Sequence, residues 1–332
     1  MEELLAGLRA AAESTRIRIL FILSHGEFNV SELTQILGQS QPRVSRHLKL
    51  MAEAGLVTRH KEGNWVLFRI RENDLGGALS RAIVDLLPGQ DAELVRDLAR
   101  LEDIRKIRSE AAASYFRENA MHWERLRALH VREEDVEAAM LRLAGDRPIG
   151  LHLDLGTGTG SVLRSFASHA AQSIGIDSSR EMLAFARVNL DSQGVRHAQI
   201  RHGDIYALPF ADATADFITI HQVLHFLDDP GRALAEAARV LRPDGRLLVV
   251  DFAPHQMEEL RERHAHRRLG LAAEDMAHWL QRASLSPQRH DVLPPPWRKD
   301  GTGLTVSLWL AAKPASATPP LTATRKQPDP AP

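Results

Sequence analysis

The stretch HLDLGTGTG, residues 152–160, places three glycines directly after a short apolar run. Glycine lets a backbone turn sharply and approach a ligand closely, so Gly156, Gly158 and Gly160 predict a binding turn between a strand and a helix. The spacing G-x-G-x-G differs from the G-x-G-x-x-G of dinucleotide-binding folds. Asp154 precedes the first glycine by two positions, where it could meet the amino-acid part of a ligand.

Strand-like and helix-like segments alternate on both sides of this turn. The runs that predict strands lie at 149–155, 172–177, 198–202, 215–221, 246–251 and 304–312. Helical segments separate most of these runs, and such alternation is typical of a parallel sheet with helices on both faces. We therefore expect an α/β Rossmann-like domain over residues 146–313.

Polar residues at the ends of the expected strands extend the candidate site. Asp177 ends the second strand, where a carboxylate can accept hydrogen bonds from ribose hydroxyls, and Ser178 follows it. Asp204 and Ile205 follow the third strand, where an adenine ring is expected. His221 ends the fourth strand.

Five sequence pieces in a fixed order give this half a family resemblance. They are HLDLGTGTG (152–160), SIGIDSSREML (173–183), IRHGDIYALPF (200–210), ADFITIHQVLHFLDDP (215–230) and ARVLRPDGRLLVVDF (238–252). Over roughly 110–312, the chain resembles the class I S-adenosylmethionine-dependent methyltransferases. The resemblance implies S-adenosylmethionine or S-adenosylhomocysteine as ligand, with Asp154 and the three glycines at its methionyl end, Asp177 at the ribose, Asp204 and Ile205 at the adenine, and His221 near the sulfur.

The sequence identifies candidate catalytic residues less clearly than candidate ligand-binding residues. Methyl transfer is an in-line displacement that depends largely on positioning, so it requires no fixed base. His221, His225 and Asp228 are candidates for a base, although each also fits a strand-end or helix-cap role. Tyr115 and Trp123 either close over the ligand or pack as ordinary aromatic residues. The catalytic residues, and enzymatic activity itself, therefore stay open.

A second motif, QSQPRVSRHLKLM at residues 39–51, predicts a helix that reads DNA. Its apolar positions, Val44, Leu48 and Met51, can face a core. Arg and Gln on the opposite face can make bidentate contacts to base edges. Residues 41–71 carry seven Lys or Arg and two acids, a local excess of +5 suited to phosphate contacts. The candidate DNA contacts are Gln41, Arg43, Ser45, Arg46, His47 and Lys49 on the helix, and Arg59 and Lys61 beyond it.

The segments around this helix complete a small domain. A helix over 32–37 is expected, with Ser31 as its cap and Gly38 as its stop. Ser40 can cap the DNA-reading helix, and two strands, 56–60 and 64–70, form a hairpin after it. Farther on, apolar residues recur at helical spacing from Leu94 to Ile107, where they could pack on this domain or on a second subunit.

The stretch NVSELTQILGQSQPRVSRHLKLMAEAGLV, residues 29–57, carries a second resemblance. Residues 12–72 resemble the winged-helix domain of the ArsR family of bacterial repressors, which implies a homodimer on a pseudo-palindromic operator in double-stranded DNA. The chain contains no cysteine, which excludes disulfides, cysteine nucleophiles and thiolate metal sites. No spacing among its histidines predicts a metal site either, so the inducer must differ from that of thiolate-based relatives.

The length of 332 residues accommodates two domains. We expect a winged-helix domain at 1–90, a helical linker and cap at 91–145, the methyltransferase-like domain at 146–313 and a disordered, proline-rich tail at 314–332. The net charge of −1 confines any DNA contact to a local patch. No apolar run approaches the ~20 residues of a membrane helix, and no signal peptide is evident, so we expect a cytoplasmic protein without membrane contact.

Two functions fit these patterns. The first is a DNA-binding transcriptional regulator whose second domain binds S-adenosylhomocysteine or S-adenosylmethionine as effector. This layout resembles that of S-adenosylhomocysteine-responsive regulators of methionine-cycle genes. The alternative is an active small-molecule methyltransferase whose DNA-binding domain controls its own gene.

Overall fold

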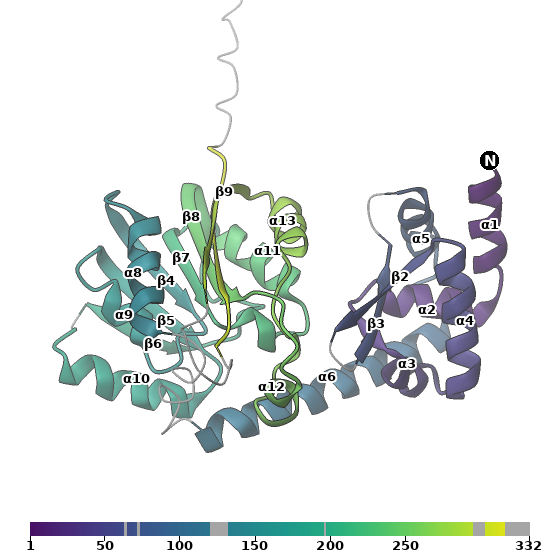
Figure 1. Cartoon of the computed structure of the whole chain (residues 1–332), viewed down its shortest axis with the longest axis horizontal. Coiled ribbons are helices and arrows are strands. Elements are labelled where there is room, and N and C mark those ends of the chain that lie inside the picture. The colour runs from purple at the N-terminus through teal and green to yellow at the C-terminus, as the bar shows by residue number, and fades with distance from the viewer. Residues whose placement is uncertain (63–64, 72–73, 120–131, 196, 295–302, 316–332) are drawn as a thin grey trace, which may run out of the picture.

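The computed structural model describes residues 1–62, 65–71, 74–119, 132–195, 197–294 and 303–315. Two domains lie side by side, and a long helix, α6 (Ala92–Asn119), runs beneath both (Figure 1). Within the described residues, no helix combines the length and the apolar character needed to cross a bilayer. The expected tail at 314–332 lies almost entirely outside the described residues. Trp123 also lies outside them.

The N-terminal domain is a winged helix-turn-helix, as expected from the sequence. Its sheet has the order β1-β3-β2, with all pairs antiparallel. The helix-turn-helix consists of α3 and α4, and the wing consists of β2 and β3. The elements are α1 (Glu2–Ala11), α2 (Ser14–Leu23), β1 (Phe28–Asn29), α3 (Val30–Leu37), α4 (Gln41–Glu53), β2 (Val57–Glu62), β3 (Trp65–Ile70) and α5 (Leu75–Asp85).

Helix α3 begins two residues earlier than expected, and its cap is Asn29. The Asn29 side chain accepts a hydrogen bond from the Glu32 amide at 3.0 Å, and the Glu32 carboxylate accepts one from the Asn29 amide at 3.0 Å. This reciprocal pair is a capping box, which needs a glutamate or glutamine three residues after the cap. Ser31 is the second residue of the helix, so the expectation of a Ser31 cap was wrong. Ser40 does precede α4, without a side-chain capping bond.

The first half of α6 belongs to the core of the N-terminal domain. Leu94 and Leu101 are buried, and Leu101 lies in one apolar cluster with residues of α2, α3 and α4. The Arg18 guanidinium on α2 contacts Asp97 of α6 at 2.6 Å and 2.7 Å, and Asp97 is fully buried. These contacts favour packing on the helix's own domain, whereas Ile107, farther along, is 66% exposed.

The C-terminal domain is an α/β fold around a seven-stranded sheet in the order β6-β5-β4-β7-β8-β10-β9. The first five strands in this order are parallel, and β10 and β9 are antiparallel additions at one edge. The strands are β4 (Ile149–Leu155), β5 (Ala170–Asp177), β6 (Ala198–His202), β7 (Ala215–His221), β8 (Leu241–Phe252), β9 (Ser286–Leu293) and β10 (Val306–Ala312). The helices are α8 (Glu133–Ala144), α9 (Ser161–Ser165), α10 (Arg180–Ser192), η2 (Leu224–Phe226), α11 (Pro230–Val240), α12 (Glu258–Arg263) and α13 (Ala273–Arg282).

Burial explains which of these strands were evident in the sequence. Central strands of a parallel sheet are covered on both faces, and the middle of β7 (217–220) and of β8 (247–250) is buried and largely apolar. The edge strand β9, SPQRHDVL, is largely exposed and contains Pro287, which edge strands tolerate. Its polar sequence gave no strand signal, and the antiparallel edge was therefore not predicted.

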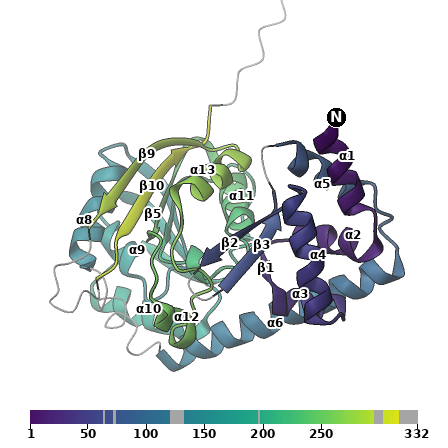
Figure 2. The same ribbon diagram turned by 45° about the vertical axis from the view of Figure 1, so that its right-hand side comes forward.

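Ionic contacts between described residues join the domains. Arg69 on β3 contacts Asp275 on α13 at 2.9 Å, where the wing approaches the C-terminal domain (Figure 2). Arg267, in the segment after α12, lies 4.0 Å from Glu32 on α3. The helix-turn-helix and the wing therefore each contact the C-terminal domain.

Candidate functional site

A cavity of about 780 Å³ opens at the carboxyl ends of β4, β5 and β7. Open α/β sheets bind ligands at this end of the strands. Eight of the nine cofactor-binding candidates line it: Asp154, Gly156, Gly158, Asp177, Ser178, Asp204, Ile205 and His221. Gly160 does not line it; this residue caps α9 and faces α10, where an added Cβ would lie 3.3 Å from Ala186.

The glycine turn has no room for a side chain at Gly156. Gly156 has φ 72°, and a Cβ there would lie 2.3 Å from a methyl group of Val223. Gly158 has φ 53°, and its amide donates a hydrogen bond to Asp177 at 2.8 Å. Both glycines line the cavity, so a ligand can approach the main chain directly.

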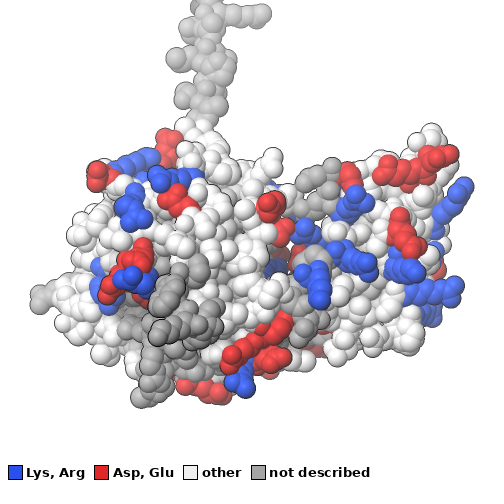
Figure 3. Space-filling model, in the orientation of Figure 1, with Lys and Arg blue, Asp and Glu red and all other residues white. Residues whose placement is uncertain are grey.

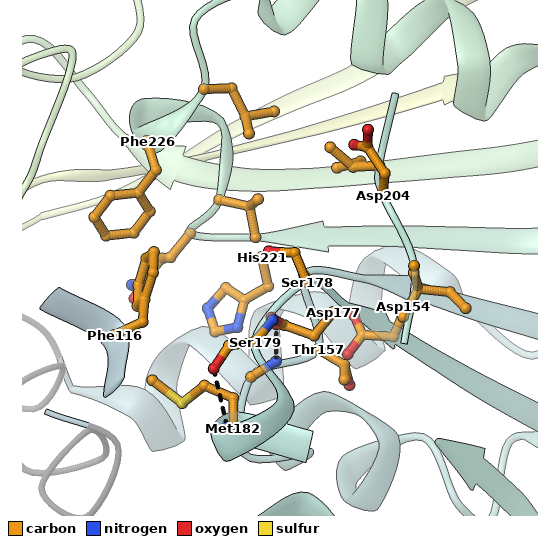
Figure 4. Close-up of a pocket in the computed structure, with 18 of the residues that line it drawn as sticks. Phe116, Asp154, Thr157, Asp177, Ser178, Ser179, Met182, Asp204, His221 and Phe226 are labelled. Atoms are coloured by element: carbon orange, nitrogen blue, oxygen red, sulfur yellow. Dashed lines mark hydrogen bonds between the residues drawn. The ribbon is translucent and has the colours of Figure 1, made fainter. Parts of the chain in front are cut away.

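Asp177 fastens the end of β5 to the glycine turn. One carboxylate oxygen accepts from the Gly158 amide, and the other accepts from the Ser179 amide at 2.8 Å (Figure 4). Burial raises the pKa of Asp177, and the backbone hydrogen bonds oppose that rise. The carboxylate thus orders the turn as well as facing the cavity, which fits the ribose role suggested by sequence.

The opposite wall contains residues that were not among the predicted ligand contacts. Phe116 of α6 and Phe226 of η2 meet edge to face at a centroid distance of 4.9 Å (Figure 4). Three further lining residues, Arg261, His266 and Arg267, come from α12 and the segment after it. Phe226 lies within the sequence piece at 215–230 that carries the methyltransferase resemblance. The other four residues of this wall lie outside all five such pieces. The side chain of Tyr115, like all of Trp123, lies outside the described residues.

The three candidate bases occupy different positions. His221 and Asp228 line the cavity, and Asp228 also contacts the Arg267 guanidinium at 2.8 Å. His225 is buried behind the wall, where its Nδ1 lies 2.6 Å from the Asp251 carboxylate. This arrangement can bind and orient a ligand, and it identifies no catalytic base.

A second candidate surface lies on α4. Gln41, Arg43, Ser45, Arg46 and Lys49 are exposed, whereas Val44, Leu48 and Met51 are buried. Arg59 and Lys61 are exposed on β2, and basic side chains gather over this part of the molecule (Figure 3).

His47 differs from the other α4 candidates because it borders the buried face of the helix. Its side chain is 12% exposed, and its ring lies 3.9 Å from Glu13. Burial lowers the pKa of His47, and the nearby Glu13 carboxylate opposes this change. The remaining α4 candidates face outward, where they could reach a DNA groove.

Comparisons with known proteins match the two halves separately. Residues 13–59 match the family of bacterial regulatory proteins of the arsR type, and residues 153–249 match a methyltransferase domain. The arsenical resistance operon repressor of Escherichia coli K12 is 47% identical over 60 residues, or 18% of this chain and 51% of the repressor. The uncharacterized methyltransferase YcgJ of Bacillus subtilis is 35% identical over 116 residues, or 35% of this chain and 46% of YcgJ.

The chain spans about half the length of these two curated relatives. The crystal structure of YcgJ covers 55% of this chain and 99% of its own, at 22% identity and a TM-score of 0.47. A methyltransferase fold implies a ligand of the S-adenosylmethionine type, which suits the glycine turn and the carboxylates around the cavity. The chain is therefore a fusion of an arsR-family DNA-binding domain with a methyltransferase domain.

Proposed function

We propose that the protein is a transcriptional regulator whose methyltransferase domain binds S-adenosylhomocysteine or S-adenosylmethionine as effector. The observation that carries this proposal is the position of α6. Leu101 of this helix is buried in the DNA-reading domain, and Phe116 of the same helix lines the ligand cavity. The two residues are 15 positions apart, or roughly 22 Å along a helix axis. A ligand that displaces Phe116 would therefore act on the DNA-reading core through one rigid element.

A second link between the domains supports the proposal. Arg267 lines the cavity and lies 2.8 Å from Asp228, another lining residue, and 4.0 Å from Glu32. Glu32 is the acidic member of the capping box on α3. A ligand that repositions Arg267 would alter an ionic contact at the start of the helix-turn-helix.

The connections through α6 and Arg267 can change DNA binding only if the ligand prefers one conformation of the protein. An effector changes operator affinity by its differential affinity for the DNA-competent state, and the coupling is reciprocal. The DNA-bound protein should therefore bind the adenosyl ligand with an affinity changed by the same factor.

The test is a titration of the full chain with labelled DNA from upstream of its own gene, read by fluorescence anisotropy at fixed salt. Saturating S-adenosylhomocysteine, or S-adenosylmethionine in a parallel series, should change the dissociation constant at least about fivefold. The ligand with the larger effect is the effector. Superimposable curves in both series would refute the proposal.

Active methyl transfer is the second candidate, and the extent of the cavity favours it. Beyond the residues assigned to the adenosyl ligand, the cavity reaches Phe116, Arg261 and His266, which could enclose a small acceptor. Incubation with S-adenosylmethionine labelled in its methyl group and a metabolite extract tests this function. Label in a product that depends on the protein supports catalysis, whereas binding without any transfer favours an effector role alone.

A further inference from the structure

Three polar side chains form a hydrogen-bonded row between β4 and β7, directly behind the cavity. The His152 ring nitrogen Nε2 lies 2.8 Å from the Thr219 hydroxyl, and that hydroxyl lies 2.6 Å from an oxygen of Asp154. Asp154 and Thr219 are register partners on the two parallel strands. His152 and Thr219 are fully buried and Asp154 is 1% exposed, so the row is almost completely shielded from water.

The direction of each hydrogen bond follows from the number of protons. The Thr219 hydroxyl donates its single proton to Asp154. The hydroxyl oxygen must then accept from an Nε2–H group of His152. Burial lowers the pKa of His152 to about 3, which keeps the ring neutral with its proton on Nε2. Its Nδ1 is left to accept from the Ser173 hydroxyl at 3.4 Å.

His152 and Thr219 are both neutral groups. The histidine and the threonine fix the orientation of the carboxylate without supplying a positive charge that would neutralise it. Asp154 also lines the cavity, where a carboxylate suits a cationic group of a ligand. The ammonium group of an adenosyl amino acid is such a group, whereas a nucleoside without the amino acid has none.

We propose that His152 and Thr219 are positioning residues that hold Asp154 for the ammonium group of the ligand. They thereby make the cavity select adenosyl amino acids over nucleoside thioethers. This inference rests on the proposed function in one respect, namely that the cavity takes an adenosyl amino acid.

The test compares Thr219→Val with Thr219→Ser in the full chain, by isothermal titration calorimetry. One ligand is S-adenosylhomocysteine, and the other is 5′-deoxy-5′-methylthioadenosine, which lacks the amino acid. Valine should weaken S-adenosylhomocysteine binding about tenfold, because the hydrogen bond that orients Asp154 is lost. It should change binding of the nucleoside by less than about twofold, and serine should restore both affinities.

The nucleoside reports whether the cavity is intact, so a folding defect is distinguishable from a loss of positioning. If Thr219→Val perturbs folding, His152→Leu provides the second arm, because it removes the donor to Thr219 and should reduce the same ligand preference. Equal weakening of both ligands in both variants, or unchanged S-adenosylhomocysteine affinity, would overturn the inference. Failure of the wild-type chain to bind S-adenosylhomocysteine would instead refute the proposed function.

Discussion

The ring of His152 is fully buried and packs 4.9 Å from the ring of Phe166, and burial lowers its pKa from 6.5 to about 3. The unfolded chain therefore takes up a proton near pH 6.5, while the folded chain does not until about pH 3. A group with a lowered folded pKa contributes stability that is present above its unfolded pKa and lost as the pH falls toward the folded value. Each pH unit in this window costs at most roughly 1.4 kcal/mol.

From this shift, we predict that His152→Gln makes the free energy of unfolding less sensitive to pH between about 6.5 and 4. Urea titrations across this range would measure the difference in slope from the wild type. His169→Gln, at an exposed histidine, is the matched control for the substitution itself. Equal pH slopes for His152→Gln and the wild type would contradict the buried neutral state.

At the same scale, Arg46 tests the DNA surface. Its side chain is exposed on α4, on the face opposite the buried Val44 and Leu48. Arg46→Ala should weaken operator binding by roughly 1–3 kcal/mol if it contacts a base, or lower the salt slope by about 1 if it contacts a phosphate. Arg187→Ala, an exposed residue of α10, is the control and should bind DNA as the wild type does. A wild-type affinity and salt slope for Arg46→Ala would exclude the predicted contact.

At the scale of elements, the start of α3 distinguishes a structural cap from an apparent one. Asn29→Ala removes the acceptor of the capping box and should lower the free energy of unfolding by about 1 kcal/mol. Ser31→Ala removes an exposed hydroxyl inside the helix and should change it by less than about 0.5 kcal/mol. Urea unfolding of the two variants gives the comparison, and a larger loss for Ser31→Ala would reverse our assignment of the cap.

The strands also show where a local sequence pattern is sufficient to predict an element. The bounds of β4, β6 and β7 coincide with the predicted runs. The central strands β4 and β7 are mostly buried and carry an apolar signal, whereas β6 is a largely exposed edge strand. Strand β9 is defined instead by its partner: it pairs with β10 from Ser286 to Leu293 while its side chains mostly face solvent. A strand of this kind depends on tertiary pairing and leaves little trace in local composition.

At the scale of the whole molecule, Arg267 connects the ligand cavity with the helix-turn-helix. Arg267→Gln removes the charge that faces both Asp228 and Glu32. We expect the ligand-dependent change in operator affinity to shrink by about 0.5 kcal/mol, or roughly twofold, because this contact carries part of the coupling. Anisotropy titrations with saturating ligand, and without ligand, would measure it.

Arg263→Gln is the matched control for this experiment. Arg263 lies on α12, is 73% exposed and contacts Glu259 of its own helix at 2.9 Å. Its substitution should leave the coupling unchanged. If Arg267→Gln retains the full ligand effect, the coupling does not pass through this contact.

The sequence by itself determined both domain types, because the glycine turn and the DNA-reading helix are local patterns whose chemistry depends on neighbouring residues. It also placed Asp177 at the cavity, since carboxyl ends of parallel strands meet at one edge. Only the tertiary structure brought Phe116 and Arg267 to that cavity, and only it placed Arg267 near Glu32. Phe116 and Arg267 belong to no motif, and both are far from Glu32 in the chain, so their positions arise from the packing of the two domains and from the length of α6.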